Sequence, residues 1–257
     1  MRLFDTHAHI GLIHTDKIER MLVVRTAFTK GVEGILSVTN NLADFENVYG
    51  ELKNEPSLYF AAGISPLEVS NTKGDWKEKL EKCATLDKVV AIGETGLDYA
   101  KGLSSKEEQA EFFTYHIRLA NRLGKTLVIH NREAGKDVLK VLKDTEVKTN
   151  LIFHCYSENL AFAESAADLP VYFSFAGNLT YRTVKDLHET VAALPSNRIL
   201  IESEAPFMVP SLYKGKRNKP QYLPETLKAV AYYQNKSEEE MAEILWENSL
   251  NAFNLTI

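Results

Sequence analysis

Residues 126–153 read TLVIHNREAGKDVLKVLKDTEVKTNLIF. The stretch begins with a β-rich run at 126–129, continues with apolar residues spaced by three and four over 135–143, and returns to a β-rich run at 150–153. This pattern predicts a strand, an amphipathic helix and a second strand. Two strands joined by a crossover helix lie parallel in one sheet, so the stretch indicates an α/β fold.

The same alternation continues along the whole chain. Helical spacing also occurs at 106–123, 160–168 and 183–194, and residues 224–253 predict two closing helices separated near 235–237. The β-rich runs are 3–5, 34–38, 59–64, 89–93, 126–129, 150–153, 171–175 and 198–201. Eight such repeats in about 250 residues are typical of a (β/α)8 TIM barrel, which we expect to span residues 1–257 as a single domain. An open doubly wound sheet is the alternative.

The composition excludes several classes of protein. A net charge of −5 argues against a protein that binds nucleic acid through a strongly basic face. A small pocket that takes nucleic-acid ends is still compatible with this charge. Cys83 and Cys155 lack CxxC spacing, so neither a disulfide framework nor a thiolate zinc site is predicted. No run approaches the roughly 20 apolar residues that cross a bilayer. We therefore expect a soluble, cytoplasmic protein with no membrane contact and no obligate protein partner.

Side chains that bind metals follow several predicted strands. His7 and His9 follow the first run as His-Ala-His, and alternate residues of an extended backbone point to the same side. The fourth, fifth, sixth and eighth runs end in Glu94, His130, His154 and Glu204. Because the carboxyl ends of all barrel strands surround one mouth, we predict that these residues bind one or two divalent ions. The alternative for each of them is a polar group that caps the barrel, and Asp5 could orient a neighbour.

Five motifs resemble those of the TatD-type metal-dependent hydrolases of the amidohydrolase superfamily. They are FDTHAH at 4–9, IGETGLDY at 92–99, IHNREA at 129–134, FHCYS at 153–157 and RNKP at 217–220. The resemblance covers nearly the whole chain and implies two adjacent divalent ions, with Glu94 bridging between the histidines. It also implies phosphodiester hydrolysis, as a deoxyribonuclease that trims DNA from an end. The nitrogen and oxygen donors permit Mg, Mn, Zn or Co.

The chain departs from the family pattern at three positions. Glu204 stands where the family usually has an aspartate, and residues 63–67 read GISPL where the family tends to have GIHPH, so Ser65 and Leu67 replace two histidines. Two alternatives to a nuclease follow from these differences. One is a hydrolase of the same superfamily that acts on an amide, lactone or aminoacyl ester. The other is a catalytically silenced homologue that still binds metal or ligand.

Three residues are candidates for direct roles on the substrate, which we expect to be DNA ends or a small phosphoester. Arg132 comes two residues after His130 and could hold a phosphate in bidentate fashion, or instead pair with Glu133. Arg217 lies in the basic segment 213–219, which is either a solvated loop or a track for a nucleic-acid backbone. Glu204 is the candidate catalytic residue, as a metal ligand that also takes a proton from the attacking water.

Overall fold

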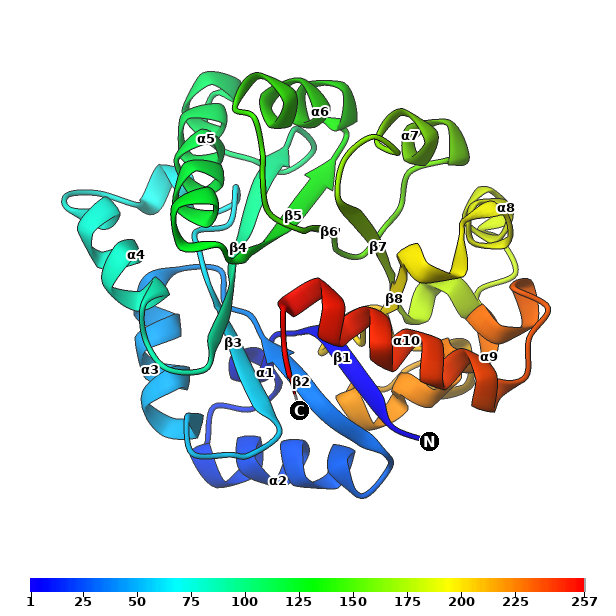
Figure 1. Ribbon diagram of the computed structural model, residues 1–257. Helices are drawn as coiled ribbons and strands as arrows, with labels where there is room; N and C mark the ends of the chain where they lie inside the picture. Colours follow the sequence, from blue (N-terminus) through cyan, green and yellow to red (C-terminus); the bar gives the residue numbers. More distant parts are fainter. Residues whose placement is uncertain (257) are drawn as a thin grey trace.

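The computed structural model, which describes residues 1–256, is a ring of parallel strands surrounded by helices (Figure 1). The strands are β1 (Leu3–Ala8), β2 (Val32–Ser37), β3 (Leu58–Ala62), β4 (Val89–Asp98), β5 (Thr126–Arg132), β6 (Leu151–Phe153), β7 (Val171–Phe175) and β8 (Ile199–Ile201). The helices are α1 (Ile10–Ile13), α2 (Lys17–Phe28), α3 (Leu42–Leu52), α4 (Trp76–Ala84), α5 (Lys106–Leu123), α6 (Gly135–Asp144), α7 (Leu160–Ser165), α8 (Lys185–Ala193), α9 (Leu223–Tyr233) and α10 (Glu238–Phe253). Successive strands pair in parallel from β1 to β8. The predicted (β/α)8 barrel is confirmed.

The barrel closes where the chain beyond β8 meets β1. The Thr6 hydroxyl donates a hydrogen bond to the Ile201 carbonyl at 3.0 Å. Further along, the Glu204 amide donates to the His7 carbonyl at 2.9 Å, and the His9 amide donates to the Ala205 carbonyl at 2.8 Å. These contacts exclude the open sheet, because an open sheet leaves its two edge strands apart. They also place Glu204 beside the histidines of β1.

Helix α10 covers the amino-terminal end of the barrel. In Figure 1 it crosses in front of β1, and it ends near the barrel axis. The ring of Phe4 lies 6.3 Å from that of Trp246 and 5.4 Å from that of Phe253, and all three side chains are buried. Since this end is filled by side chains, a ligand must enter at the opposite end, where the strands finish.

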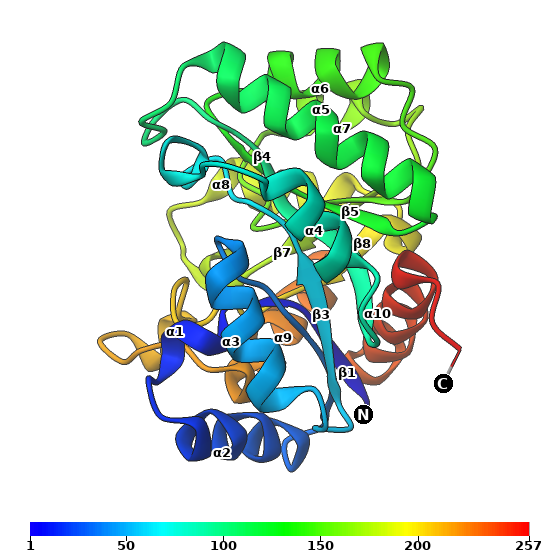
Figure 2. The ribbon, with the colours of Figure 1, turned by 90° about the vertical axis from the view of Figure 1, so that its left-hand side faces the viewer.

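The outer helices agree with the sequence pattern to within a few residues. Helix α5, predicted at 106–123, has those bounds, and a capping box between Ser105 and Glu108 begins it. Figure 2 shows α5 and α4 lying along the outside of β4 and β3. Helix α7 was expected over 160–168 but ends at Ser165. The chain continues in tighter turns, in which the Ala167 amide donates to the Glu164 carbonyl and the Leu169 amide to the Ala166 carbonyl.

Three strands run further than the sequence predicts. β1 was expected to end at 5, β4 at 93 and β5 at 129, but they reach Ala8, Asp98 and Arg132. Pairing between β4 and β5 resumes after a register shift, so that Gly96 lies opposite His130 and Asp98 opposite Arg132. Several candidate ligands therefore lie inside the last part of a strand rather than just after it.

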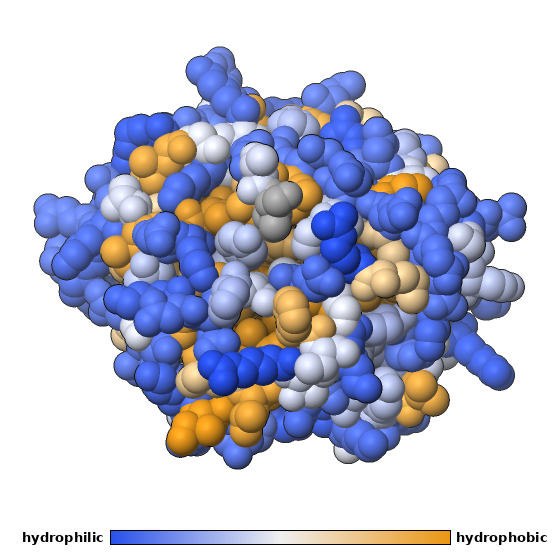
Figure 3. All heavy atoms as spheres, turned by 60° about the horizontal axis from the view of Figure 1, so that its bottom comes forward, coloured by the Kyte–Doolittle hydropathy of each residue, from blue (hydrophilic) through white to orange (hydrophobic). Residues whose placement is uncertain are grey.

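The surface over α2 is mostly hydrophilic with separate hydrophobic patches (Figure 3). Helix α2 exposes Ile18, Leu22 and Phe28. Ile18 and Leu22 lie one helical turn apart on the same face. Exposed apolar side chains of this kind are ordinary in folded proteins. Within residues 1–256, every helix is too short or too polar to cross a membrane.

Candidate metal centre

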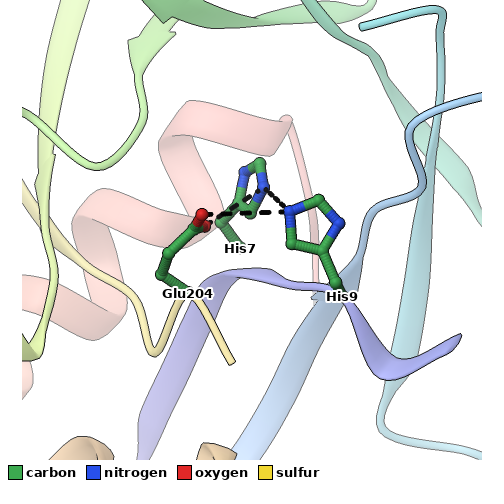
Figure 4. A group of neighbouring side chains, drawn as sticks. All are labelled: His7, His9 and Glu204. Atoms are coloured by element: carbon green, nitrogen blue, oxygen red, sulfur yellow. Dashed lines mark hydrogen bonds and ion pairs between the residues drawn. The ribbon is translucent and has the colours of Figure 1, made fainter. Parts of the chain in front are cut away.

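The first group of donors joins the two ends of the closed sheet. His7 and His9 come from the end of β1, and Glu204 comes from the segment that follows β8; Figure 4 shows the three side chains pointing toward one another. The Nε2 atom of His7 lies 3.3 Å from Nε2 of His9 and 3.4 Å from Oε2 of Glu204. Glu204 has a positive φ of 54°, a backbone conformation held by its hydrogen bond to His7. The backbone contacts that close the barrel thus bring this group together.

The second group lies between β4, β5 and β6. Nδ1 of His130 is 2.9 Å from Oε1 of Glu94, and Nε2 of His154 is 3.6 Å from the same oxygen. The two imidazoles are 3.3 Å apart, measured from Nδ1 of His130 to Nε2 of His154. His154 follows β6 directly, as predicted, and its amide donates to the Ile129 carbonyl of β5. The three residues form a compact set of one oxygen and two nitrogen donors.

Glu94 stands between the two groups. Its Oε2 atom lies 3.6 Å from Nε2 of His7 and 3.7 Å from Nε2 of His9, whereas its Oε1 atom faces His130 and His154. The pairing of β4 with β5 shifts its register between Ile92 and Thr95, the interval that contains Glu94. An irregularity of this kind changes the direction in which a side chain points from its strand. The carboxylate is therefore oriented to serve both groups at once.

The donor set fits divalent cations. Two atoms that bind one tetrahedral zinc ion at about 2.1 Å lie about 3.4 Å apart, close to the spacings around His7. In residues 1–256, Oε2 of Glu204 and Oε2 of Glu202 are buried and accept no hydrogen bond. A buried polar atom without a partner is unfavourable unless something binds it. The residues present thus suit the ions that the sequence pattern predicts.

The charges around the cluster favour an added cation. Burial opposes ionisation of Glu94, but the charge of His154 and hydrogen bonds from His130 and other histidines hold its pKa well below the usual range. For His154, burial lowers the pKa, yet Glu94 and the other carboxylates raise it well above its ordinary value. The buried carboxylates thus draw positive charge to the imidazoles. A divalent cation would supply that charge in place of protons.

Asp98, a residue that the strand-end pattern did not single out, holds the outer side of His130. Its Oδ2 atom lies 2.9 Å from Nε2 of His130, and its Oδ1 atom accepts the amides of Ala100 and Lys101. The buried side chain of Gln109 in α5 in turn holds the backbone of Asp98, accepting from its amide at 2.8 Å and donating to its carbonyl at 3.1 Å. A carboxylate in this position fixes the orientation of a metal-binding imidazole. Its place in the motif IGETGLDY at 92–99 was the signal that the sequence offered.

Two more buried carboxylates, those of Asp5 and Glu202, contact the residues that carry the candidate ligands. Oδ1 of Asp5 accepts the amides of Ser203 and His7, so Asp5 orients its neighbours. Burial raises the pKa of Asp5 to about 7, against the lowering effect of the hydrogen bonds from Ser203. Glu202 accepts the Cys155 amide at 2.8 Å and lies 3.6 Å from Nδ1 of His154. Asp5 thus ties the segment after β8 to β1, and Glu202 ties it to the segment after β6.

The cluster lies at the bottom of a cavity of about 500 Å³ at the carboxyl ends of the strands. Its lining residues are His9, Asn40, Leu67, Glu94, Asp98, Lys101, His130, Asn131, Arg132, His154, Cys155, Ser157, Asn178, Glu204, Phe207 and Met208. A cavity of this volume suits a small molecule or a single nucleotide.

The two arginine candidates lie in different places. Arg132 lines the cavity and is exposed, and among the described residues it forms no ion pair with Glu133 or any other carboxylate. Arg217 lies outside the cavity lining, where its Nη2 atom donates to the Leu12 carbonyl at 2.9 Å. The structure thus brings Arg132, but not Arg217, to the cavity that holds the candidate metal ligands.

The residues that depart from the family pattern also lie at this site. The Ser65 hydroxyl donates to Oε1 of Glu94 at 3.3 Å and is fully buried. Leu67 lines the cavity wall. At position 67 the mouth is consequently more apolar than it would be with a histidine.

The chain is similar to known proteins over almost its whole length. A family model described as TatD related DNase matches residues 4–254. "Uncharacterized metal-dependent hydrolase TatD" of Mycobacterium tuberculosis is 33% identical over 261 residues, which cover 98% of each chain. A Citrobacter rodentium protein named 3'-5' ssDNA/RNA exonuclease TatD is 27% identical over 241 residues, covering 91% of this chain and 92% of that one. The crystal structure of YJJV, a TatD homolog of Escherichia coli K12, matches with a TM-score of 0.90 and 25% identity, covering 99% of both chains.

Proposed function

Because the chain belongs to the TatD family of metal-dependent hydrolases, we propose that it binds divalent cations in the histidine–glutamate cluster and hydrolyses phosphodiester bonds at DNA ends. The observation that carries the proposal is the orientation of Glu94, whose two oxygens face separate sets of donors. Paired cation sites suit phosphodiester hydrolysis, since both the attacking and the leaving oxygen need stabilisation. The Citrobacter relative, named for exonuclease action on single-stranded DNA and RNA, supports the same class of substrate.

The cluster divides naturally between two cations. His7, His9 and Glu204 would hold one, His130 and His154 would hold the other, and Glu94 would contribute one oxygen to each. When bound, such cations supply Lewis acidity, which lowers the pKa of water and offsets charge on phosphoryl oxygens. The donors include no sulfur, so Mg, Mn, Zn and Co all suit the site.

The protein side chains then perform the remaining tasks. Glu204 would accept a proton from the attacking water. Two observations support this role: the residue lines the cavity, and its Oε2 atom accepts no hydrogen bond within residues 1–256. Arg132 would hold the non-reacting oxygens of the substrate phosphate, a role supported by its place in the same cavity without a carboxylate partner among residues 1–256. These roles require a negatively charged substrate in the cavity.

The proposal predicts that the protein releases nucleotides from single-stranded DNA when manganese or magnesium is present. Protein stripped with a chelator should be inactive, and adding back the metal should restore release. The measurement is a time course of labelled products from oligonucleotides marked at either end. Failure of the metal-loaded protein to cleave any oligonucleotide would reject the nuclease function.

A second candidate is hydrolysis of another bond, such as an amide, lactone or aminoacyl ester. Leu67 favours it, because this apolar side chain makes the β3 side of the mouth uncharged. Assaying small esters and amides beside the oligonucleotides separates the two functions. Turnover of a small ester without cleavage of DNA would favour this candidate.

We expect that Asp98→Ala weakens manganese affinity by about 10- to 100-fold, the usual effect of losing a carboxylate that orients a metal-binding histidine. The reason is that Nε2 of His130 loses its acceptor at 2.9 Å. Calorimetric titration with manganese measures the change, and circular dichroism confirms the fold. Asp98→Asn keeps an acceptor oxygen and should recover part of the affinity.

A matched control is Asp144→Ala, which removes an exposed carboxylate at the end of α6. It should bind manganese as the native chain does. Equal manganese affinity in Asp98→Ala and the native chain would show that packing alone orients His130.

A further inference from the structure

The cavity mouth has two chemically different halves. Leu67 follows β3, and Phe207 and Met208 follow β8, so apolar side chains lie on the half built by β8, β1, β2 and β3. Lys101 follows β4 and Arg132 ends β5, which places the cations on the other half. The metal-binding cluster lies between them. A ligand that spans the mouth therefore meets apolar surface on one side and positive charge on the other.

Phe207 is the most exposed apolar side chain of this lining. It is 49% exposed, and its ring lies 6.1 Å from that of His9 at an interplanar angle of 73°. Its amide donates to the Glu204 carbonyl at 2.8 Å, so the backbone of Phe207 is held next to the first group of donors. Met208 beside it is 39% exposed. An aromatic ring left open at a cavity rim is a surface on which a flat ligand can stack.

The opposite half is suited to phosphate. Lys101 and Arg132 are exposed, and within residues 1–256 neither side chain pairs with a carboxylate. Free cations beside a cluster that would hold divalent metals add to the attraction for a polyanion. A nucleotide combines a flat apolar base with charged phosphate, which matches both halves at once.

We propose that Phe207 forms a subsite for the base of the terminal nucleotide, while Lys101 and Arg132 receive the phosphate backbone across the mouth. This inference rests on the proposed nuclease function. An unpaired base can turn either face to a side-chain ring, whereas the last base pair of a duplex exposes only its outer face, so the subsite favours single-stranded ends. Any of the four bases can stack in this way, so the subsite is tolerant of sequence.

The test uses single-stranded oligonucleotides whose phosphorothioate linkages resist hydrolysis and which carry 2-aminopurine at one end. Stacking on an aromatic ring quenches 2-aminopurine fluorescence, so binding to the native chain with manganese should lower the signal for one end. Phe207→Ala should lose the quenching and bind about tenfold more weakly, the factor that one base–aromatic stack provides. Phe207→Tyr keeps a ring and should bind as the native chain does.

An oligonucleotide with an abasic terminus isolates the base contribution. The native chain and Phe207→Ala should bind it equally, because the interaction removed by the substitution is absent. Leu212→Ala, which removes another exposed apolar side chain from the loop after β8 but outside the cavity, is the matched control and should behave as native. Equal weakening of normal and abasic ends by Phe207→Ala, or unchanged quenching, would overturn the subsite.

The same experiments separate this inference from the proposed function. If the native chain releases nucleotides from DNA and Phe207→Ala does so with unchanged KM, the subsite fails while the nuclease function stands. If the native chain neither binds nor cleaves any oligonucleotide, both fail together.

Discussion

Replacing Glu94 with glutamine is expected to lower kcat by at least about 10³-fold. The variant should lose bound cations, and the charge that they would stabilise in the transition state is worth several kcal/mol. The substitution keeps the volume of the side chain but removes the charge and one of the two acceptor oxygens. Those oxygens face His7 and His9 on one side and His130 and His154 on the other. Both groups of donors should therefore bind metal more weakly. Metal content after dialysis, measured by mass spectrometry, and nucleotide release are the two readouts.

His130→Ala provides an independent check on the same site, since it removes a donor from the second group only. It should lower metal stoichiometry while the helical signal in circular dichroism stays unchanged. The matched control is Glu164→Gln, on the exposed side of α7, which should retain full metal content and activity. Full metal content in both Glu94→Gln and His130→Ala would refute the assignment of the site.

Glu204→Gln is expected to lower kcat by roughly 10²- to 10⁴-fold, the range associated with loss of a general base. Glutamine has the length of glutamate but cannot take a proton from water at neutral pH. Glu204 also lies 3.4 Å from Nε2 of His7, so some loss of metal at the first group should accompany the loss of rate. Single-turnover kinetics at saturating manganese separate the two effects.

Glu204→Asp restores the residue that the family usually has at this position. It shortens the side chain by one methylene, and a displacement of about 1 Å can cost on the order of 100-fold in rate. Because the surrounding groups of this chain are placed around a glutamate, the aspartate variant should be active but slower than native. Native-like activity in Glu204→Gln would exclude Glu204 as the base, and faster turnover in Glu204→Asp would show that the native glutamate limits the rate.

The architecture was predictable because its signals are local. The alternation of β-rich runs with helical spacing depends on a few neighbouring residues at a time, as in residues 126–153. Strand ends were less predictable. β4 extends to Asp98 because it pairs again with β5 beyond the register shift, and that pairing involves residues distant in sequence.

The candidate ligands were also predictable, for a topological reason. Any residue at the carboxyl end of a barrel strand faces the same mouth, so His7, His130 and His154 come together whatever the details of the loops. Their participation in metal binding is our proposal, and the distances between their donor atoms support it. The predicted role of Arg217 in substrate binding remains a prediction, since its side chain bonds to the Leu12 carbonyl outside the cavity.

What the sequence determined by itself was thus the barrel and the residues that surround its mouth, because both follow from short-range periodicity and strand order. Only the tertiary structure decided how these residues face one another. The two-sided orientation of Glu94 depends on the register between β4 and β5, and the position of Glu204 depends on hydrogen bonds between β1 and the segment after β8. The contact of Asp98 with His130 and the open ring of Phe207 likewise arise from long-range packing. Such contacts join residues far apart in sequence, where local propensity carries no information about distance.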